Sequence, residues 1–124
     1  MPTHTLDLSF GTPPLNANQR LHWAQRAKLT KSIRHEAATR ARAAHIGPKD
    51  HVTVTLHYQP RDKRRRDRGN LVPTHKALLD GLVDAGIVPD DNPTYVDERM
   101  PEIHPPVKGQ PSKCWLTIET RRTP

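Results

Sequence analysis

One segment, residues 64–91 with the sequence RRRDRGNLVPTHKALLDGLVDAGIVPDD, constrains the fold most strongly, because its apolar and charged residues recur at helical spacing. The apolar face comprises Leu78, Leu79, Leu82, Val83 and Ala85. Lys76, Asp80 and Asp84 follow one another at intervals of four residues and therefore lie on the opposite face. The pattern predicts a helix with one buried side and one charged side.

The ends of this helix are also marked in the sequence. Asn70 can cap the first turn, Pro73 is tolerated there, and Gly86 suits the left-handed position just past the end. Arginines and the carboxylate of Asp67 precede the helix, and the adjacent acids Asp90 and Asp91 follow it. In a chain with a formal net charge of +7, acids gathered at both ends of a helix require a reason, and a divalent cation acting on a phosphate backbone would supply one.

The rest of the chain predicts strands and one further helix. Alternating apolar and polar residues predict strands over 51–58 and 3–10, and residues 23–44, rich in Ala, Arg and Lys, should be helical. Residues 95–103 and 114–120 are expected to form a hairpin, in which Pro101 restricts the first strand to an edge or a bulge. We therefore expect a single mixed α/β domain over 1–124, with about four strands, two main helices and a frayed tail at 121–124.

The amino-acid composition limits the size of the hydrophobic core and the kinds of partner that the chain can bind. Hydrophobic residues make up only 33% of the 124 residues and there are 13 prolines, so long loops and additional burial in a homo-oligomer are expected. The 20 Lys and Arg residues outnumber the 13 Asp and Glu residues, which favours an anionic partner such as nucleic acid or an acidic surface. The single cysteine, Cys114, is expected to be a buried, inert thiol in a reducing compartment. No apolar run reaches the ~18 residues of a membrane span, so we expect a soluble, cytoplasmic protein with no membrane partner.

The helix over 23–44 has two interpretations. Near one stripe at helical spacing lie Trp23, Ala27, Ile33, Ala37, Ala41 and Ala44. The basic residues are spread over the rest of its surface, which favours a solvated flank over a face that binds DNA. Trp23 and His22 could stack on a base, but a tryptophan anchored in the core is the favoured interpretation.

Hydrolysis of a phosphodiester needs a nucleophilic water and stabilisation of charge on the phosphate and the leaving oxygen, and Mg²⁺ provides all of these. Asp67 before the helix over 70–86 and Asp91 after it could converge as oxygen ligands, although Asp90 and Asp91 can also be turn residues. Lys76 would contact a phosphate oxygen or pair with Asp80 as a solvated lysine. The eight histidines are scattered, with no pair at zinc-ligand spacing, and are expected to be polar surface or strand residues.

The motifs RRRDRGN at 64–70, KALLDGLVDAG at 76–86 and DD at 90–91 together resemble the RusA-type Holliday junction resolvases, small endonucleases of bacteria, prophages and phages. The order of elements extends the resemblance over nearly the whole chain. It implies a mixed α/β homodimer with a small sheet and flanking helices. It also implies binding of four-way DNA junctions and symmetric nicking of two strands of like polarity with Mg²⁺ or Mn²⁺.

The resemblance assigns roles to individual residues. Asp67 and Asp91 match the metal-binding aspartates of the family, Lys76 matches its functional lysine, and Asp80 and Asp90 match further acidic positions of the motif. Contacts to DNA are expected from the basic run and the residue that follows it: Lys63, Arg64, Arg65, Arg66, Arg68 and Asn70.

The chain departs from the family at Gly69. The family pattern Asp-x-Asp-Asn reads Asp67-Arg68-Gly69-Asn70 here, so one metal-binding carboxylate is missing. Its loss should weaken metal affinity and slow cleavage, whereas junction binding through the arginines need not suffer. The sequence thus leaves two main hypotheses, an active junction resolvase and a junction-binding protein of the same fold with weak or no cleavage. A third is a basic interaction protein without structure-selective DNA binding.

Overall fold

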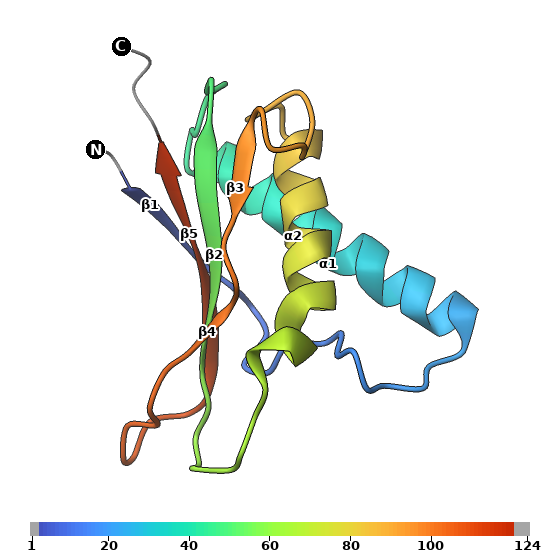
Figure 1. Ribbon diagram of the computed structural model, residues 1–124, viewed down its shortest axis with the longest axis vertical. Coiled ribbons are helices and arrows are strands. Elements are labelled where there is room, and N and C mark those ends of the chain that lie inside the picture. The colour runs from blue at the N-terminus through green and yellow to red at the C-terminus, as the bar shows by residue number, and fades with distance from the viewer. Residues whose placement is uncertain (1–2, 121–124) are drawn as a thin grey trace.

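The computed structural model describes residues 3–120 as a mixed α/β structure with a small sheet and two α-helices. Its elements, in chain order, are β1 (Thr3–Asp7), α1 (Trp23–Ala43), β2 (Val52–Gln59), the short 3₁₀ helix η1 (Arg68–Leu71), α2 (Val72–Asp84), β3 (Val96–Glu98), β4 (Glu102–Ile103) and β5 (Lys113–Thr120). Both helices lie on the same side of the sheet (Figure 1). The tail expected at 121–124 lies outside the described residues.

The sheet has β2 near its centre, with strand order β1-β5-β2-β3 and with β4 also paired to β2. β5 runs antiparallel to both β1 and β2, whereas β3 and β4 run parallel to β2. The alternation seen in the sequence explains which face each residue takes, because successive side chains on a strand point to opposite sides of the sheet. Val52, Val54 and Leu56 are fully buried beneath the helices, and the residues between them face the other side.

The prediction that residues 95–103 and 114–120 form a hairpin is wrong. β3 and β4 pair with β2 rather than with β5, and residues 104–112 pass the end of β2 to reach β5 on its other side (Figure 1). This connection contains three prolines and is too long for a tight hairpin turn. The expectation that Pro101 confines its strand to an edge is confirmed, because Pro101 separates β3 from β4 at the edge of the sheet.

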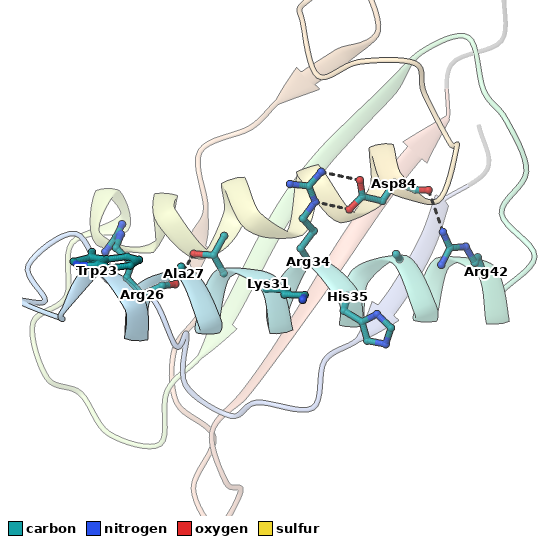
Figure 2. A pocket seen from close by; sticks show the side chains of 10 residues that line it. Trp23, Arg26, Ala27, Lys31, Arg34, His35, Arg42 and Asp84 are labelled. Atoms are coloured by element: carbon teal, nitrogen blue, oxygen red, sulfur yellow. Dashed lines mark hydrogen bonds and ion pairs between the residues drawn. The ribbon is translucent and has the colours of Figure 1, made fainter.

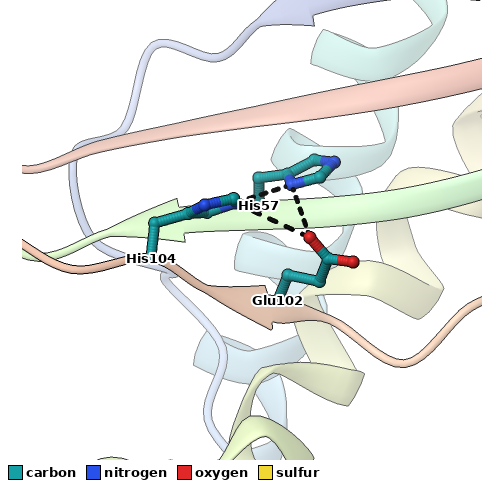
Figure 3. A group of neighbouring side chains, drawn as sticks. All are labelled: His57, Glu102 and His104. Atoms are coloured by element: carbon teal, nitrogen blue, oxygen red, sulfur yellow. Dashed lines mark hydrogen bonds and ion pairs between the residues drawn. The ribbon is translucent and has the colours of Figure 1, made fainter.

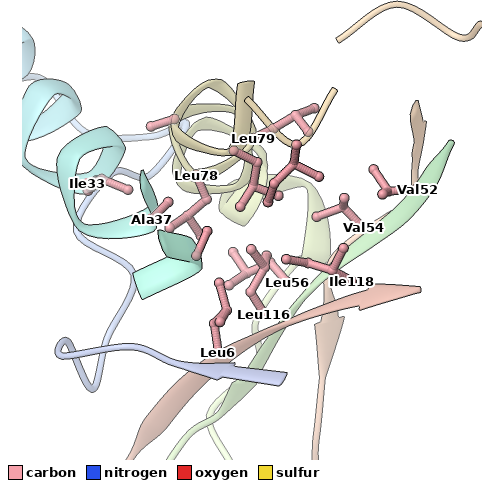
Figure 4. Close-up of a cluster of buried hydrophobic side chains, with 14 of the residues drawn as sticks. Leu6, Ile33, Ala37, Val52, Val54, Leu56, Leu78, Leu79, Leu116 and Ile118 are labelled. Atoms are coloured by element: carbon pink, nitrogen blue, oxygen red, sulfur yellow. The ribbon is translucent and has the colours of Figure 1, made fainter. Parts of the chain in front are cut away.

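The core fills the space between the sheet and the two helices (Figure 4). The sheet contributes, among others, Leu6, Val54, Leu56, Leu116 and Ile118, and the helices contribute Ile33, Ala37, Leu78, Leu79 and Leu82. The helices approach closely at Gly81, where a Cβ atom would lie 2.2 Å from the backbone oxygen of Arg34. The predicted apolar face of α2 is therefore confirmed as the centre of the core.

The expectation of a core tryptophan at position 23 is wrong. Trp23 begins α1 and is 77% exposed, and Ala27 is exposed as well. The buried residues of α1 are Ile33, Ala37, Ala38 and Ala41, all in the part of the helix that crosses α2. The first turns of α1 extend beyond the sheet (Figure 1), so a side chain there has no core to enter.

The predicted ends of α2 are correct at one end only. Gly86 has a φ of 80° just past the helix, as expected for a left-handed cap, and Pro73 lies in the first turn. Asn70 does not cap α2, because it lies inside η1 and its Oδ1 accepts a hydrogen bond from Asn18.

Cys114 is buried as predicted, and burial raises the pKa of its thiol to about 12. Within residues 3–120, neither helix has the length and apolarity needed to cross a membrane.

Candidate functional site

Lys76 joins two of the predicted acidic residues. Its Nζ donates to Asp80 Oδ1 at 3.1 Å, a contact that follows from their spacing of four residues on α2. It also donates to a carboxylate oxygen of Asp91, in the loop that follows the helix. The side chains of Lys76, Asp80 and Asp91 are 49%, 29% and 30% exposed, so the group is open to a ligand from solvent.

Asp90 is used in the turn beside this group. Its Oδ1 accepts the backbone N–H of Asp91 at 2.8 Å, and its Oδ2 accepts from Asn92 Nδ2 at 3.2 Å. These contacts are typical of an acid that shapes a turn. Asp90 therefore orients the loop that carries Asp91.

Asp67 lines a hollow to which Lys76, Asp80 and Asp91 do not contribute. It precedes η1, its side chain makes no capping hydrogen bond there, and it lines this hollow of about 220 Å³ with Arg65, Arg66 and Asn70. Among residues 3–120, Asp67 does not form a cluster of three carboxylates with oxygens within 4.8 Å of one another. Gly69 follows in η1, and a Cβ atom at this position would meet nothing within 4 Å.

The basic run before α2 divides into one anchored residue and several exposed ones. Arg66 is held by Asp62 through Nη2 to Oδ1 at 2.7 Å and through Nη1 to the backbone oxygen at 3.0 Å, and it lies over the ring of Tyr58. Hydrogen bonding to Arg66 lowers the pKa of Asp62. Exposed side chains in the run belong to Lys63, Arg64, Arg65 and Arg68. Arg66 thus braces the loop. Arg64 also pairs with Asp62 at 3.5 Å, but its side chain is 80% exposed, so it and its exposed neighbours are accessible to an anion.

A groove of about 770 Å³ runs along α1 beside α2 (Figure 2). Trp23 lies at one end, and the basic residues Arg26, Lys31, Arg34 and Arg42 line it. Arg34 makes a two-point contact with Asp84 of α2, and Arg42 Nη2 donates to the backbone oxygen of Asp84 at 3.0 Å. The Arg34 guanidinium lowers the pKa of Asp84. Asp84 therefore engages two of the arginines that line this surface, which we call the α1 groove.

A third group lies on the face of the sheet opposite the helices. His57 Nδ1 is 2.8 Å from His104 Nε2 and 3.5 Å from Glu102 Oε2, and His104 Nε2 is 3.8 Å from the same oxygen (Figure 3). The described residues contain one group of at least three His, Cys, Asp or Glu side chains with ligand atoms within 4.8 Å, and it is this one. His57, Glu102 and His104 could hold a metal ion.

Sequence reasoning missed this third group and treated its histidines as ordinary polar residues. His57 and His104 are 47 residues apart, so no local spacing connects them. They meet because β4 pairs with β2 in parallel, in place of the predicted hairpin. The partial burial of His57 lowers the pKa of its imidazole and favours the neutral form that can bind a metal.

The described residues thus contain a carboxylate and lysine group beside α2, a basic α1 groove and an imidazole group on the open sheet face. No protein-family model matches the chain, and a search of curated proteins finds no match.

Proposed function

We propose that the protein is a metal-dependent endonuclease of the RusA type, which resolves four-way DNA junctions as a homodimer by paired symmetric nicks in recombination and repair. The observation that carries the proposal is the pairing of Lys76 with Asp80 and Asp91, on a helix that directly follows a run of exposed arginines. Acids held beside a cation-rich surface suit hydrolysis of a polyanion. The proposed compartment is the cytoplasm of a bacterial cell or of a phage-infected host.

The proposed cofactor, Mg²⁺ or Mn²⁺, prefers carboxylate oxygens as ligands. Among residues 3–120 no three carboxylates have oxygens within 4.8 Å of one another, so a bound cation would have to draw its acidic ligands together. Asp80 and Asp91 would hold it, with Asp67 and Asp90 as the further ligands that the resemblance to the family assigns. When bound, the metal supplies a more acidic water and stabilises charge at the phosphate.

The remaining chemistry belongs to side chains of the chain itself. Lys76 has an exposed ammonium between two acids and can move from Asp91 to a phosphate oxygen when DNA arrives. The exposed residues Lys63, Arg64, Arg65 and Arg68 would contact the DNA backbone on either side of the cut, with Asn70 beside them. In a homodimer, two such sites would face the two strands that are cut.

A junction-binding protein with weak or no cleavage is the second candidate, and Gly69 is the observation that favours it. The position lacks the carboxylate that the family pattern places there. The surroundings of Gly69 are open, and its backbone does not have the left-handed φ seen at Gly86 and Gly109, so an aspartate can be introduced without a steric cost.

The deciding experiment compares the wild-type chain with Gly69→Asp and with the uncharged control Gly69→Asn. Each protein is incubated with a labelled four-way junction across a titration of Mg²⁺ and Mn²⁺, and binding is measured in parallel with metal omitted. Cleavage by the wild type supports the resolvase. The second candidate is selected if the wild type binds the junction without cleaving it, and if Gly69→Asp, but not Gly69→Asn, restores cleavage.

If no variant cleaves and all bind junction and linear duplex with equal affinity at physiological salt, both proposals are wrong. The protein would then be a basic interaction protein without structure selectivity. Sedimentation of the wild type tests the homodimer separately from cleavage.

A further inference from the structure

We propose that His57, Glu102 and His104 form a second cation site, selective for Zn²⁺ and unsuited to Mg²⁺, on the face of the sheet that the helices leave open. The site lies apart from the acids beside α2 and does not depend on nuclease activity. His57 comes from β2 and Glu102 from β4, and His104 is the residue that follows β4 (Figure 3).

Strand pairing brings the three side chains to one face. His57 is paired directly with Glu102 in the parallel register of β2 and β4. Directly paired residues share a face of the sheet, and His104, two residues beyond Glu102, points to the same side. The backbone of a sheet, rather than a mobile loop, therefore positions the donors.

The separations of the donor atoms suit a small tetrahedral cation. Bonds of about 2.0–2.2 Å from zinc to nitrogen and oxygen place tetrahedral ligand atoms about 3.3–3.6 Å apart. The three separations here are 2.8, 3.5 and 3.8 Å, which bracket that spacing. Small side-chain rotations would equalise them. When a cation binds, the proton that His104 Nε2 donates to His57 Nδ1 would move to His104 Nδ1, so that both facing nitrogens offer a lone pair.

The chemistry of the donors selects the metal. Two imidazole nitrogens and one carboxylate oxygen are a ligand set that zinc accepts, with a fourth position left for water or another ligand. Magnesium requires a shell of oxygens at near-octahedral geometry and gains little from imidazole. The chain would thus hold two sites of different chemistry, one for a hard cation and one for a borderline transition metal.

Neighbouring residues already orient the ligands as a metal site requires. The other ring nitrogen of His57, Nε2, lies 2.9 Å from Thr117 Oγ1. A hydrogen bond donated there keeps the proton on Nε2 and leaves the Nδ1 lone pair toward the proposed cation. Trp115 stacks on both imidazoles, with ring centroids 5.1 Å from His57 and 4.9 Å from His104, and limits their rotation.

Access and burial are also suitable. The side chain of His57 is 12% exposed, whereas His104 and Glu102 are 33% and 53% exposed, so the site opens to solvent on one side. A cation there would tie the two-residue strand β4 to β2, which ends just before the basic run. The site would therefore brace the base of the loop that we propose to contact DNA.

The test uses the full chain, freed of metal with a chelator and then titrated with Zn²⁺ against a chromogenic zinc indicator. We expect one equivalent to bind per chain, without competition from millimolar Mg²⁺. Co²⁺ in place of Zn²⁺ should give the visible absorption bands of a low-coordinate site. Thermal unfolding should shift to higher temperature with Zn²⁺, since a ligand that binds only the folded state stabilises it.

Variants assign the binding to these residues. His104→Gln and Glu102→Gln should weaken Zn²⁺ binding by more than the roughly 10- to 100-fold loss typical of outer-shell partners, and Thr117→Val should fall within that range. The matched control His45→Asn removes an exposed histidine whose φ of 56° suits asparagine, and it should bind as the wild type does. Asp91→Asn should also retain zinc binding, whatever its effect on cleavage.

Circular dichroism of each metal-free variant verifies that it is folded. The proposal is overturned if the folded wild type binds no stoichiometric Zn²⁺, or if His104→Gln and Glu102→Gln bind as tightly as the wild type. It is equally overturned if His45→Asn weakens binding as much as they do. In those cases the three side chains form a hydrogen-bonded polar cluster only.

Discussion

Lys76 and Asp91 form an ion pair across 15 residues of chain, with the lysine ammonium donating to the aspartate carboxylate. The same lysine contacts Asp80 within α2. Because exposed ion pairs contribute only about 0–1 kcal/mol to stability, the fold does not need this arrangement. In the nuclease that we propose, the pair would instead hold a cation and two acids together at the surface.

Replacing Asp91 with Asn should separate catalysis from folding. We expect metal-dependent junction cleavage to fall by more than the roughly 10- to 100-fold loss seen for outer-shell partners, with little change in thermal stability. Asp97→Asn is the matched control, because Asp97 is an exposed acid that pairs with Arg99 and is not among the proposed ligands. If the wild type does not cleave, the comparison is made in the Gly69→Asp background. Equal cleavage by the two variants would remove Asp91 from the proposed site.

Trp23→Ala should weaken DNA binding without affecting the fold. Stacking of a base on an aromatic ring is worth about 1–3 kcal/mol, and Trp23 is 77% exposed at the end of the basic α1 groove. Fluorescence anisotropy with a labelled junction measures the loss. Met100→Ala, at a 51% exposed position outside the groove, is the control. Unchanged affinity in Trp23→Ala would exclude the α1 groove as a DNA surface.

Local patterns predicted the elements that local chemistry determines. Alternation identified β2 and β5, helical spacing identified the buried face of α2, and Gly86 marked its end. The pairing of Lys76 with Asp80, one of two alternatives for that lysine, also follows from spacing on a helix.

Relationships between distant segments could not be read in the same way. The partner of a strand as short as β4 depends on where β2 and β5 already lie, so the predicted hairpin was wrong and the meeting of His57 with His104 was missed. Trp23 was misplaced because apolar spacing does not reveal where a helix leaves the sheet. The position of Asp67 relative to Asp91 likewise depends on two loops.

Gly81→Ala should destabilise the protein although alanine favours helix by about 1 kcal/mol over glycine. The added Cβ would lie 2.2 Å from the backbone oxygen of Arg34 and 2.7 Å from Ala37 Cβ, so α1 and α2 must move apart. Overpacking of this kind costs about 1–3 kcal/mol or more, measurable by urea unfolding. Gly47→Ala, where nothing lies within 4 Å, is the control and should not destabilise. Equal stability of the two variants would mean that the helices are not in close contact.

His75 should make the folded state sensitive to acid. It lies on α2, is 1% exposed, and neither ring nitrogen has a hydrogen bond of good geometry among residues 3–120. Burial, with a smaller contribution from the charge of His57, lowers the pKa of His75 to about 4 from 6.5, so the 3.9 Å approach to Glu98 is not an ion pair at neutral pH. Between these two values the unfolded chain binds more protons than the folded one. Stability must therefore fall as the pH decreases from 6.5 toward 4.

The shift in the pKa of His75 from 6.5 to about 4 corresponds to about 3 kcal/mol in the free energy of unfolding. His75 alone removes this stability as the pH falls across that range. His75→Leu replaces two poorly hydrogen-bonded nitrogens with an apolar side chain, so its stability at pH 7 should equal or exceed that of the wild type. The difference in unfolding free energy between His75→Leu and the wild type should then grow by about 3 kcal/mol as the pH falls to 4. Urea unfolding at matched ionic strength measures it. His45→Asn, at an exposed position, should follow the wild type. Parallel pH profiles for wild type and His75→Leu would show that His75 takes up its proton without leaving the fold.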